Sequence, residues 1–427
     1  MTVAIDQDVV VIGGGIAGLS AAIAAAREGA DVRLVSRNET TLRHASGLID
    51  VLGYVHEDGP VVDPFDAIEK LPAHHPYRRV GVDAIREGLA TFDDVTGDSY
   101  RGGHTDANAL VPTHGGTIKP TARYPATSAA GLASDPRETL LVGLERVPDF
   151  DPGVAADRLS AAEVPFETRA ATVQFPIAVR DDAKVTRFAH LLDENDPVEV
   201  DGTTVSLRRA LAEAVAPSLG DAERVGFPAI LGEDHPDAVR ADLEAVLGAD
   251  VFEVPMGPPS LPGLRLEALL YDALEAAGAH FEVGSPLVDF DADEGTVSTV
   301  YLDRSGQRIP MTADQFVLAT GGLASDGIEA DREAVTEPLF DCHVPHPDDR
   351  YDWFEDDAFG DHAFARFGLQ IDDDLRPLDA TGDPEFSNLR AAGAVLGNYD
   401  LAAEKSGSGI SLATGVAAGR AAAEDTS

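Results

Sequence analysis

The sequence is poor in thiols, with a single cysteine, Cys342. One thiol cannot form an intramolecular disulfide or a CxxC redox pair, and an iron–sulfur cluster normally needs four thiolates. Any cluster that works with this chain must therefore sit on another chain. We also expect no metal site, because the acidic runs at 355–357 and 372–374 are most simply solvated surface.

Lysine is scarce too, and basic residues as a whole are outnumbered. The chain has 32 Lys and Arg against 75 Asp and Glu, a formal net charge of −43, and only four of the basic residues are lysines. Nucleic acid and anionic membrane surfaces are poor partners for such a chain. Self-repulsion of this size needs a short Debye length to be screened, so the composition indicates adaptation to high salt. An acidic protein that works at ordinary salt is the alternative.

Long apolar runs are also few. The stretch 9–26 is uncharged for 18 residues, long enough to suggest a membrane span or a signal peptide. However, Asp6 and Asp8 precede it, no basic residue does, and its glycines indicate a loop followed by a helix. We therefore expect a cytoplasmic protein. The 44% of apolar residues in periodic runs along 427 residues predict a globular chain of about two folding units.

The N-terminal pattern is that of a nucleotide-binding fold. Residues 8–12 form a buried-strand run, 19–28 read as a helix, and 31–35 read as a second strand. A glycine turn joins the first strand directly to the helix. This unit predicts an α/β fold with a doubly wound, Rossmann-like sheet.

The turn is a GxGxxG motif of Gly13, Gly15 and Gly18, with Gly14 inside it. Gly13 permits the tight turn, Gly15 lets the backbone approach a pyrophosphate, and Gly18 lets the helix pack closely on the strand. The start of the helix offers unpaired N–H groups to the anion. The motif alone is weak, but its place between strand and helix predicts nucleotide binding.

The end of the second strand leaves the identity of the nucleotide open. A full fingerprint has Asp or Glu there for the adenosine ribose, whereas this chain has Ser36 and Arg37, with Glu39 three residues late. Ser36 can hydrogen-bond a ribose and Arg37 can meet a phosphate. Alternatively, Arg37 is a solvated charge and the cofactor is a mononucleotide without the adenosine half.

Two later glycine sites extend the prediction. Thr320 and Gly321 follow the last of three strand-like runs, at 281–290, 296–303 and 315–319, and Gly393 follows a short strand at 389–392. Gly407 and Gly409 then begin a helix, and a helix start aimed at a flavin would stabilise negative charge on the reduced ring. The alternative is an ordinary small-residue helix packed on the first one.

The middle of the chain predicts an inserted domain. Strand-like runs, among them 172–176, alternate with helices from 139 to 255, and a proline-rich segment at 255–263 marks the return. We therefore assign 1–136 and 256–427 to a discontinuous flavin-binding domain and 137–255 to an inserted α/β cap for a substrate or partner. Residues 101–127 read as loops.

Several segments carry a resemblance to a known family. The order of the glycine sites resembles flavin dehydrogenases related to fumarate reductase. LVSR with HASGLIDVL at 34–52, PPSLPGLRL at 258–266, FGLQIDDDLRP at 367–377 and AAGAVLGNYD at 391–400 resemble, more narrowly, the B subunits of anaerobic glycerol-3-phosphate dehydrogenase. The resemblance spans nearly the whole chain and is loose in the inserted region.

The resemblance implies a cofactor, partners and an activity. It implies FMN, with FAD as the alternative that a complete GxGxxG suits better, and it makes Ser46 and Gly47 candidate flavin contacts. The partners it implies are an FAD-containing A subunit and an iron–sulfur C subunit that holds the complex at the inner face of the membrane and passes electrons to quinone. The implied reaction oxidises glycerol 3-phosphate to dihydroxyacetone phosphate.

No catalytic residue can be assigned from the sequence. That oxidation needs a base for the C2 hydroxyl, a hydride acceptor and cations for the phosphate. His44, His362, Arg366, Lys119 and Arg123 are candidates without a motif. Two other functions stay open: a self-sufficient flavin oxidoreductase acting on another small hydroxy substrate, and a scaffold without catalysis.

Overall fold

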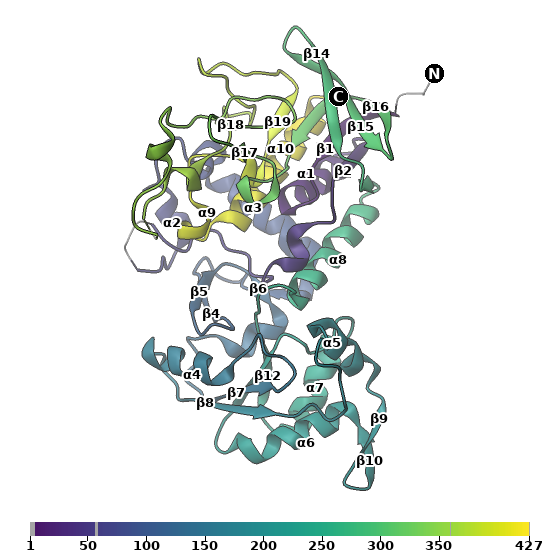
Figure 1. The fold of residues 1–427 in the computed structure, drawn as a ribbon, viewed down its shortest axis with the longest axis vertical. Coiled ribbons are helices and arrows are strands. Elements are labelled where there is room, and N and C mark those ends of the chain that lie inside the picture. Colours follow the sequence, from purple (N-terminus) through teal and green to yellow (C-terminus); the bar gives the residue numbers. More distant parts are fainter. Residues whose placement is uncertain (1–4, 56–58, 359, 427) are drawn as a thin grey trace. The chain divides into compact units, whose positions relative to one another are not determined.

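The computed structural model describes residues 5–55, 59–358 and 360–426, and the chain divides into two compact units. We call Met1–Thr41, Asp50–Thr96 and Leu269–Ser427 unit 1, and Leu42–Ile49 with Gly97–Ala268 unit 2. Figure 1 shows the elements of both.

These bounds differ from the predicted ones, because unit 2 takes in more than 137–255. The short segment before residue 50 joins unit 2 through a bridge between Ile49 and Arg123. The first turns of helix α8, Leu261–Ala276, are tied to unit 2 by an ion pair of Arg265 with the buried Glu253.

The sheet of unit 1 has the doubly wound order that the sequence predicts. Strands β13, β2, β1, β16 and β19 lie side by side and are all parallel. Apolar β-branched residues fill the centre of β1, where Val9, Val10 and Val11 are fully buried, as parallel strands covered on both faces require. Their bounds are Ile5–Ile12 for β1, Val32–Ser36 for β2, His280–Val283 for β13, Gln307–Leu318 for β16 and Leu389–Ala391 for β19.

On the edge opposite β1, strand β16 pairs with two strands, β15 and β19. Its first part pairs antiparallel with β15, Thr296–Arg304, and its last residues pair parallel with β19. β14, Leu287–Asp293, completes an antiparallel meander with β15. The predicted run 281–290 is therefore two strands, β13 and β14, because Gly284 at φ 86° and Pro286 separate them.

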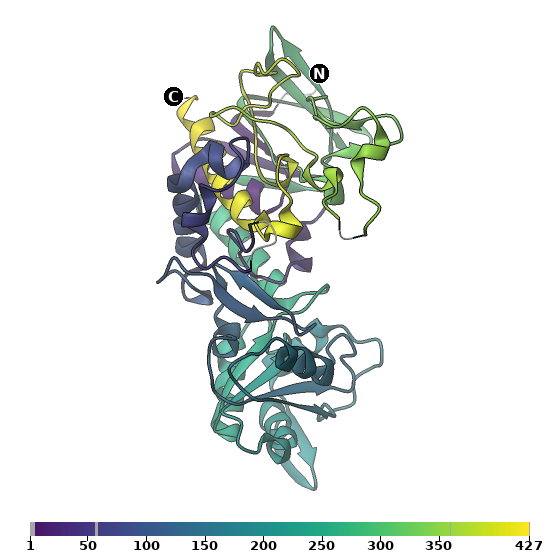
Figure 2. The same ribbon diagram turned by 90° about the vertical axis from the view of Figure 1, so that its left-hand side faces the viewer.

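Three helices of unit 1 pack closely through small residues. α1, Ile16–Arg27, lies against α10, Gly407–Glu424, and a Cβ at Gly415 or Gly419 would overlap the carbonyl oxygen of Ala17 or Ala21. α3, Pro76–Thr96, packs on α10 in the same way, since a Cβ at Gly88 would lie 2.9 Å from the Ala413 nitrogen. Figure 2 shows α10 in yellow beside these purple and dark blue helices.

Short elements complete unit 1. They are α2 at Pro64–Ile68, α9 at Leu401–Glu404, the β17–β18 hairpin at Glu329–Ala330 and Val335–Thr336, and 3-10 turns at Leu323–Ser325, Arg350–Trp353, Ala363–Arg366 and Gly393–Val395. Asp63 and Asp400 cap α2 and α9 through their side chains.

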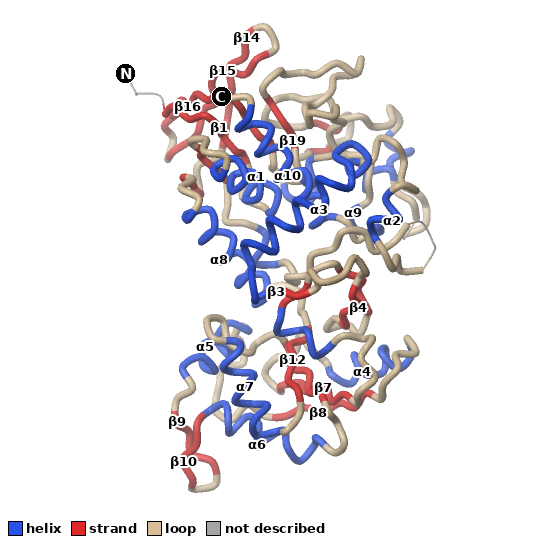
Figure 3. The backbone as a smooth tube through the Cα atoms, turned by 180° about the vertical axis from the view of Figure 1, so that it is seen from behind, coloured by secondary structure: helices blue, strands red, loops and turns tan. Residues whose placement is uncertain are grey.

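Unit 2 is a second α/β layer structure around a parallel sheet of order β12-β11-β7-β8. Figure 3 shows its strands in red among helices α4 to α7 in blue. The core draws residues from both layers, including Val142, Val225, Phe188, Leu211 and Leu243. The strands are β7 Thr139–Leu144, β8 Thr168–Val173, β11 Arg224–Pro228 and β12 Asp250–Val254, and the helices are α4 Pro152–Ala161, α5 Val185–Glu194, α6 Leu207–Leu219 and α7 Pro236–Leu247.

Two local predictions in unit 2 were wrong. The run 172–176 is not one strand, because β8 ends at Val173 and Phe175 turns into the core, where it packs edge-on against Phe188 at 5.1 Å. Residues 101–127 are not loops only, since they hold short strands that pair with each other. These are β3 Tyr100–Arg101 with β6 Tyr124–Pro125, and β4 Ala109–Pro112 with β5 Ile118–Thr121.

Other short elements complete unit 2. The hairpin of β9 Pro197–Val200 and β10 Thr203–Ser206 lies further along the chain. 3-10 turns occupy Thr41–His44, Gly97–Ser99 and Ala126–Gly131.

Candidate functional site

Three of the predicted glycine sites meet at one edge of the unit 1 sheet. Ile12 pairs with Leu318 across the sheet, and Leu318 pairs with Ala391. The chain continues from these residues into Gly13, into Thr320 and Gly321, and into Gly393. The carboxyl ends of parallel strands are where such folds bind ligands, so residues more than 370 positions apart form one candidate site.

The glycines of the GxGxxG motif do different work. Gly13 has φ 119°, which strongly favours glycine, and a Cβ at Gly18 would overlap the Gly13 carbonyl oxygen. A Cβ at Gly14 would lie 3.1 Å from the Ser36 hydroxyl oxygen. Gly15 is different, because a Cβ there would meet no atom of a described residue within 4 Å. The space into which a Gly15 side chain would point, at the start of α1, is thus open among the described residues.

The start of α1 fits an anionic group. Gly15 is the N-cap residue, no side chain caps the helix, and its first turn carries no acidic residue. Unpaired N–H groups and the positive end of the helix dipole favour a phosphate at such a position. The open space above Gly15 leaves room for it.

Thr320 adds an unsatisfied group to the same edge. Its hydroxyl oxygen is buried and has no hydrogen-bond partner within 5–55, 59–358 and 360–426. Buried hydroxyls are normally paired. The next residue, Gly321, has φ 87° and turns the chain away from the strand. Together with the space at Gly15, the Thr320 hydroxyl fits a site that a bound cofactor completes.

Ser36 and Arg37 lie at the end of β2, as predicted. The Ser36 hydroxyl donates to the Asn38 carbonyl at 2.7 Å. Arg37 is 66% exposed and its guanidinium is 3.8 Å from the Asp326 carboxylate. Such an exposed pair is weak, so the Arg37 side chain is available for a ligand at this strand end.

The start of α10 is held by the segment that begins at Asp50. The Gly409 amide donates to the Asp50 carbonyl at 2.7 Å, and the Asp50 amide donates to the Ser408 hydroxyl at 2.8 Å. A Cβ at Gly409 would overlap the Tyr77 hydroxyl. Gly409 therefore has a packing role. Gly407 keeps more room, since a Cβ there would first meet Leu401 at 3.4 Å.

Gly393 and the packing of α10 bear on the alternative of an ordinary small-residue helix. A Cβ at Gly393 would lie 2.6 Å from the Ala17 Cβ, and its amide donates to the Thr414 hydroxyl at 2.9 Å. Small residues of α10 do pack on α1, as that alternative predicts. The packing uses Gly415 and Gly419, and the beginning of the helix is a separate feature.

Ser46 and Gly47 belong to unit 2, unlike the other candidate contacts. Gly47 is buried with φ 77°, and a Cβ there would lie 2.7 Å from the Pro262 Cβ. The Ser46 hydroxyl accepts from the Leu48 amide at 3.5 Å. The structure therefore does not gather Ser46 and Gly47 with the glycine sites inside one unit.

The candidates for acid–base chemistry are scattered. His362 is engaged within its own loop, with Nδ1 accepting from the Glu355 amide and Nε2 3.3 Å from the Ala358 carbonyl, and Arg366 pairs with Asp361. His44 is exposed in unit 2. Of this set, His362 and Arg366 are therefore engaged close to their own positions in unit 1, and His44 belongs to the other unit.

Lys119 and Arg123 also lie in unit 2, in the region of β5. Arg123 is 8% exposed and donates to the carbonyls of Gly102 and Ala122 at 3.4 and 3.0 Å. These hydrogen bonds of Arg123 stabilise the short strands, which is a structural role.

A buried polar cluster in unit 1 was missed. His75 is 1% exposed, its Nδ1 accepts from the Tyr77 amide at 3.1 Å, and its Nε2 lies 3.1 Å from a Glu404 oxygen. Tyr399 packs edge-on against His75 with ring centroids 5.9 Å apart. The only sequence signal was His75 before Pro76 at the start of a helix. This pattern suggests an ordinary turn, because the partners of His75 lie more than 300 residues later in the chain.

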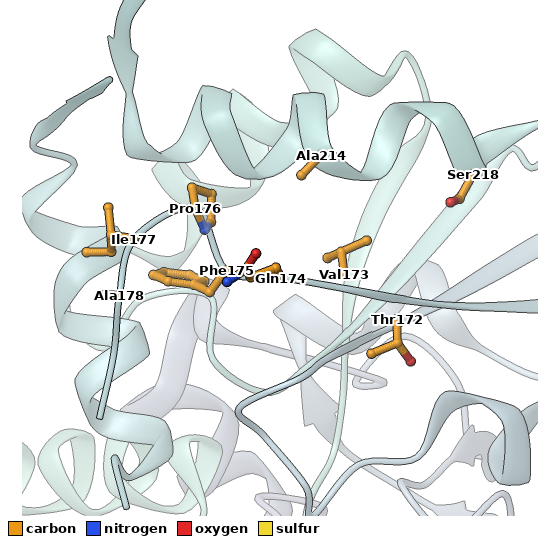
Figure 4. A pocket seen from close by; sticks show the side chains of 9 residues that line it. All are labelled: Thr172, Val173, Gln174, Phe175, Pro176, Ile177, Ala178, Ala214 and Ser218. Atoms are coloured by element: carbon orange, nitrogen blue, oxygen red, sulfur yellow. The ribbon is translucent and has the colours of Figure 1, made fainter. Parts of the chain in front are cut away.

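Unit 2 has a pocket of about 570 Å³ where β8 ends and α6 passes (Figure 4). None of its nine described lining residues is titratable, so it offers no acid–base chemistry. They are Thr172, Val173, Gln174, Phe175, Pro176, Ile177, Ala178, Ala214 and Ser218.

The described residues present neither a cluster that could hold a metal ion nor a helix that could cross a membrane. No group of three or more His, Cys, Asp or Glu side chains is arranged to hold a metal ion. No described helix combines the length and apolar character that crossing a membrane requires.

Comparison with known proteins gives the chain relatives over its full length. The FAD binding domain family matches residues 8–410. The chain is 63% identical over 422 residues to the probable B subunit of an anaerobic glycerol-3-phosphate dehydrogenase of Halobacterium salinarum, covering 99% of each. The B subunit of the same enzyme from Pectobacterium atrosepticum is 29% identical over 95% of this chain and 96% of that one. A solved E. coli quinol fumarate reductase aligns over 100% of this chain and 71% of its own, with 11% identity and a TM-score of 0.43.

Proposed function

The chain belongs to the FAD binding domain family and, within it, to the B subunits of anaerobic glycerol-3-phosphate dehydrogenase, and we propose that it is the flavin-binding subunit of such an enzyme. The reaction is the oxidation of glycerol 3-phosphate to dihydroxyacetone phosphate. The family predicted from the four sequence segments is thus confirmed, and a halophilic relative agrees with the salt-adapted composition.

One observation supports the proposed position of the flavin. The strand ends at Ile12, Leu318 and Ala391 share one sheet edge, and the glycine turns that follow leave open space at Gly15. We infer that the phosphates lie on the start of α1, and that Thr320, Gly321 and Gly393 line the cofactor from the neighbouring strand ends. Gly407 at the start of α10 would face the ring.

The cofactor is a flavin, and FAD is favoured over FMN. The matching family binds FAD, whereas the prediction of FMN as the main cofactor finds no support in it. The end of β2 has Ser36 and Arg37 where an acidic residue would bind the adenosine ribose, and this difference is the argument for a mononucleotide. We propose FAD, with the Ser36 hydroxyl and the Arg37 guanidinium meeting its adenosine half.

The bound flavin supplies the acceptor for the hydride that leaves C2 of the substrate. The chain itself must orient that carbon, exclude water and accept the C2 hydroxyl proton. No base is assigned, because His362 is engaged in its own loop and His44 belongs to unit 2.

The electrons must then leave the chain. With one cysteine and one GxGxxG motif, it offers neither a cluster nor a second dinucleotide site. We propose that it works beside an FAD-containing A subunit, and that an iron–sulfur C subunit holds the complex at the inner face of the membrane and delivers electrons to quinone. The naming of its relatives as B subunits supports a multisubunit complex.

Purification of the full chain alone in molar salt tests the proposal. The chromophore is released by denaturation and identified by chromatography, and glycerol 3-phosphate is then added to the native protein without oxygen. Bound FAD that bleaches makes this chain catalytic by itself. Bound FAD that bleaches only after the partner subunits are added makes it a relay. A chain that takes up no flavin, alone or in the complex, is a scaffold, and the proposal is then wrong.

A further inference from the structure

Tyr399 carries a buried hydroxyl that makes no hydrogen bond to a described residue. Its side chain is 3% exposed, and its oxygen has no hydrogen bond to any residue that the structure describes. Leaving such a group unpaired destabilises the folded chain. Tyr77, which packs on the same histidine, shows the usual arrangement, because its hydroxyl donates to the Val51 carbonyl at 2.6 Å. The Tyr399 hydroxyl is therefore a site that something outside the chain can satisfy.

Tyr399 belongs to the chain segment that joins two proposed flavin contacts. It lies between Gly393, which follows β19, and Gly407, which begins α10, and both are proposed flavin contacts. Glu404 and Tyr77 interact electrostatically with it. Tyr77 in turn reaches the start of α10, with its hydroxyl 3.3 Å from the Ser406 carbonyl.

The chemistry around Tyr399 selects the kind of ligand atom. Burial first, and the Glu404 carboxylate second, raise the pKa of the Tyr399 phenol above its usual value. The hydroxyl therefore stays protonated, and its hydrogen finds no acceptor among the described residues, so a ligand atom that accepts would pair it. A negatively charged ligand is disfavoured beside Glu404. A neutral carbonyl oxygen fits, and a phosphate does not.

We propose that Tyr399 donates its hydroxyl hydrogen to a carbonyl oxygen of the bound isoalloxazine ring, and that His75 and Glu404 position it for this contact. The proposal rests on the flavin binding proposed above. It adds a specific cofactor contact from a segment that the glycine motifs do not include.

The positioning pair has a defined proton arrangement. Because Nδ1 of His75 accepts from the Tyr77 amide, the ring proton is on Nε2, which donates to Glu404. The same Glu404 oxygen accepts from the Ser406 hydroxyl at 2.9 Å, and the other accepts from the Asp400 amide at 3.2 Å. Glu404 thus fixes both ends of the turn that carries Tyr399 to α10.

The test is titration of FAD, and separately of FMN, into the flavin-free full chain in molar salt, followed by flavin fluorescence. Tyr399→Phe removes the hydroxyl alone. We expect its Kd for flavin to rise about tenfold, the loss of one hydrogen bond at about 1.4 kcal/mol. The flavin-free Tm should be unchanged or higher, because an unpaired buried hydroxyl has been removed.

Tyr77→Phe is the matched control. It removes a hydroxyl that is already paired, so the flavin-free Tm should fall and the flavin Kd should change less than for Tyr399→Phe. An unchanged Kd in Tyr399→Phe, or a fall in its flavin-free Tm like that of Tyr77→Phe, would overturn the assignment. A wild-type chain that binds no flavin overturns the proposed function as well, so the two failures are distinguishable.

A double-mutant cycle tests the role of Glu404. If Glu404 acts through Tyr399, Glu404→Ala should weaken flavin binding in the wild type and have little further effect in Tyr399→Phe. Glu404→Gln, which keeps an acceptor for His75, should retain most of the affinity. Independent, additive effects of Glu404→Ala and Tyr399→Phe would overturn the positioning role.

Discussion

The amide of Ala319 donates a 2.8 Å hydrogen bond to the carbonyl oxygen of Ile12. Ile12 is the last residue of β1 and the residue before Gly13, and Ala319 is the residue before Thr320. The bond therefore fixes the second glycine site one step beside the first. A matching bond from the Ala392 amide to the Leu318 carbonyl, at 2.9 Å, places Gly393 next in the row.

Gly15→Val should abolish flavin retention and leave the chain folded. The backbone at Gly15, with φ −76°, tolerates a side chain, and its Cβ would enter space that no described residue occupies. The cost to the flavin-free chain is a poorer helix cap, about 1 kcal/mol. We expect the flavin Kd to rise at least tenfold. Absorbance near 450 nm after gel filtration and the flavin-free Tm together measure both effects.

Gly18→Val is the comparison for that variant. Its side chain would overlap the Gly13 carbonyl oxygen, so it should lower the flavin-free Tm sharply, whereas Gly15→Val should not. If Gly15→Val kept full flavin absorbance, the proposed placement of the phosphates on α1 would be wrong.

Gly419→Ala should destabilise unit 1 through the contact between α1 and α10. The new methyl would overlap the Ala21 carbonyl oxygen, and backbone cannot move aside as a flexible side chain can. Overpacking of this kind costs about 1–3 kcal/mol. Urea unfolding in molar salt measures the change, with Ala417→Ser on the same helix as the control. Equal stability of Gly419→Ala and the wild type would contradict the close packing of these helices.

The fold of unit 1 was largely predictable, because its signals are local. A strand, a glycine turn and a helix follow one another within residues 8–28, and the meander before Thr320 alternates over short distances. The domain bounds were not predictable in this way. Unit 2 gains its extra segments through long-range contacts such as Arg265 with Glu253, and a periodic pattern carries no information about them.

The candidate site was predictable only in part. The glycine positions follow from turn chemistry, so Gly13, Gly321 and Gly393 could be found where their positive φ values occur. The role of Gly409 in packing on Tyr77 could not. The partners in the cluster around Tyr399 are separated by more than 300 residues, and a single histidine, glutamate or tyrosine gives no signal by itself.

Arg37→Ala should distinguish the two cofactors. The pair with Asp326 is exposed on both sides, so its loss should change stability by less than about 0.5 kcal/mol. If Arg37 meets the adenosine half, the variant should weaken FAD binding about three- to tenfold and leave FMN binding unchanged. Asp326→Asn, which removes only the partner, should change neither. Equal losses for FAD and FMN would move Arg37 away from the adenosine half.

Asp135→Asn should remove a pH-dependent part of the stability of unit 2. Hydrogen bonds from the Arg137 guanidinium lower the pKa of the Asp135 carboxyl from 3.8 to about 2. A lowered pKa in the folded state contributes stability above the unfolded value, and that stability is lost as pH falls through about 2. The carboxylate is partly exposed, so the wild type should exceed the variant by about 1 kcal/mol at pH 7. The gap should narrow below about pH 4. Urea unfolding between pH 7 and pH 3 measures this difference in unfolding free energy. The exposed pair of Arg180 and Asp182 is the comparison, and Asp182→Asn should be as stable as the wild type at every pH. A difference for Asp135→Asn that does not depend on pH would mean that the Asp135 carboxyl titrates normally in the folded chain.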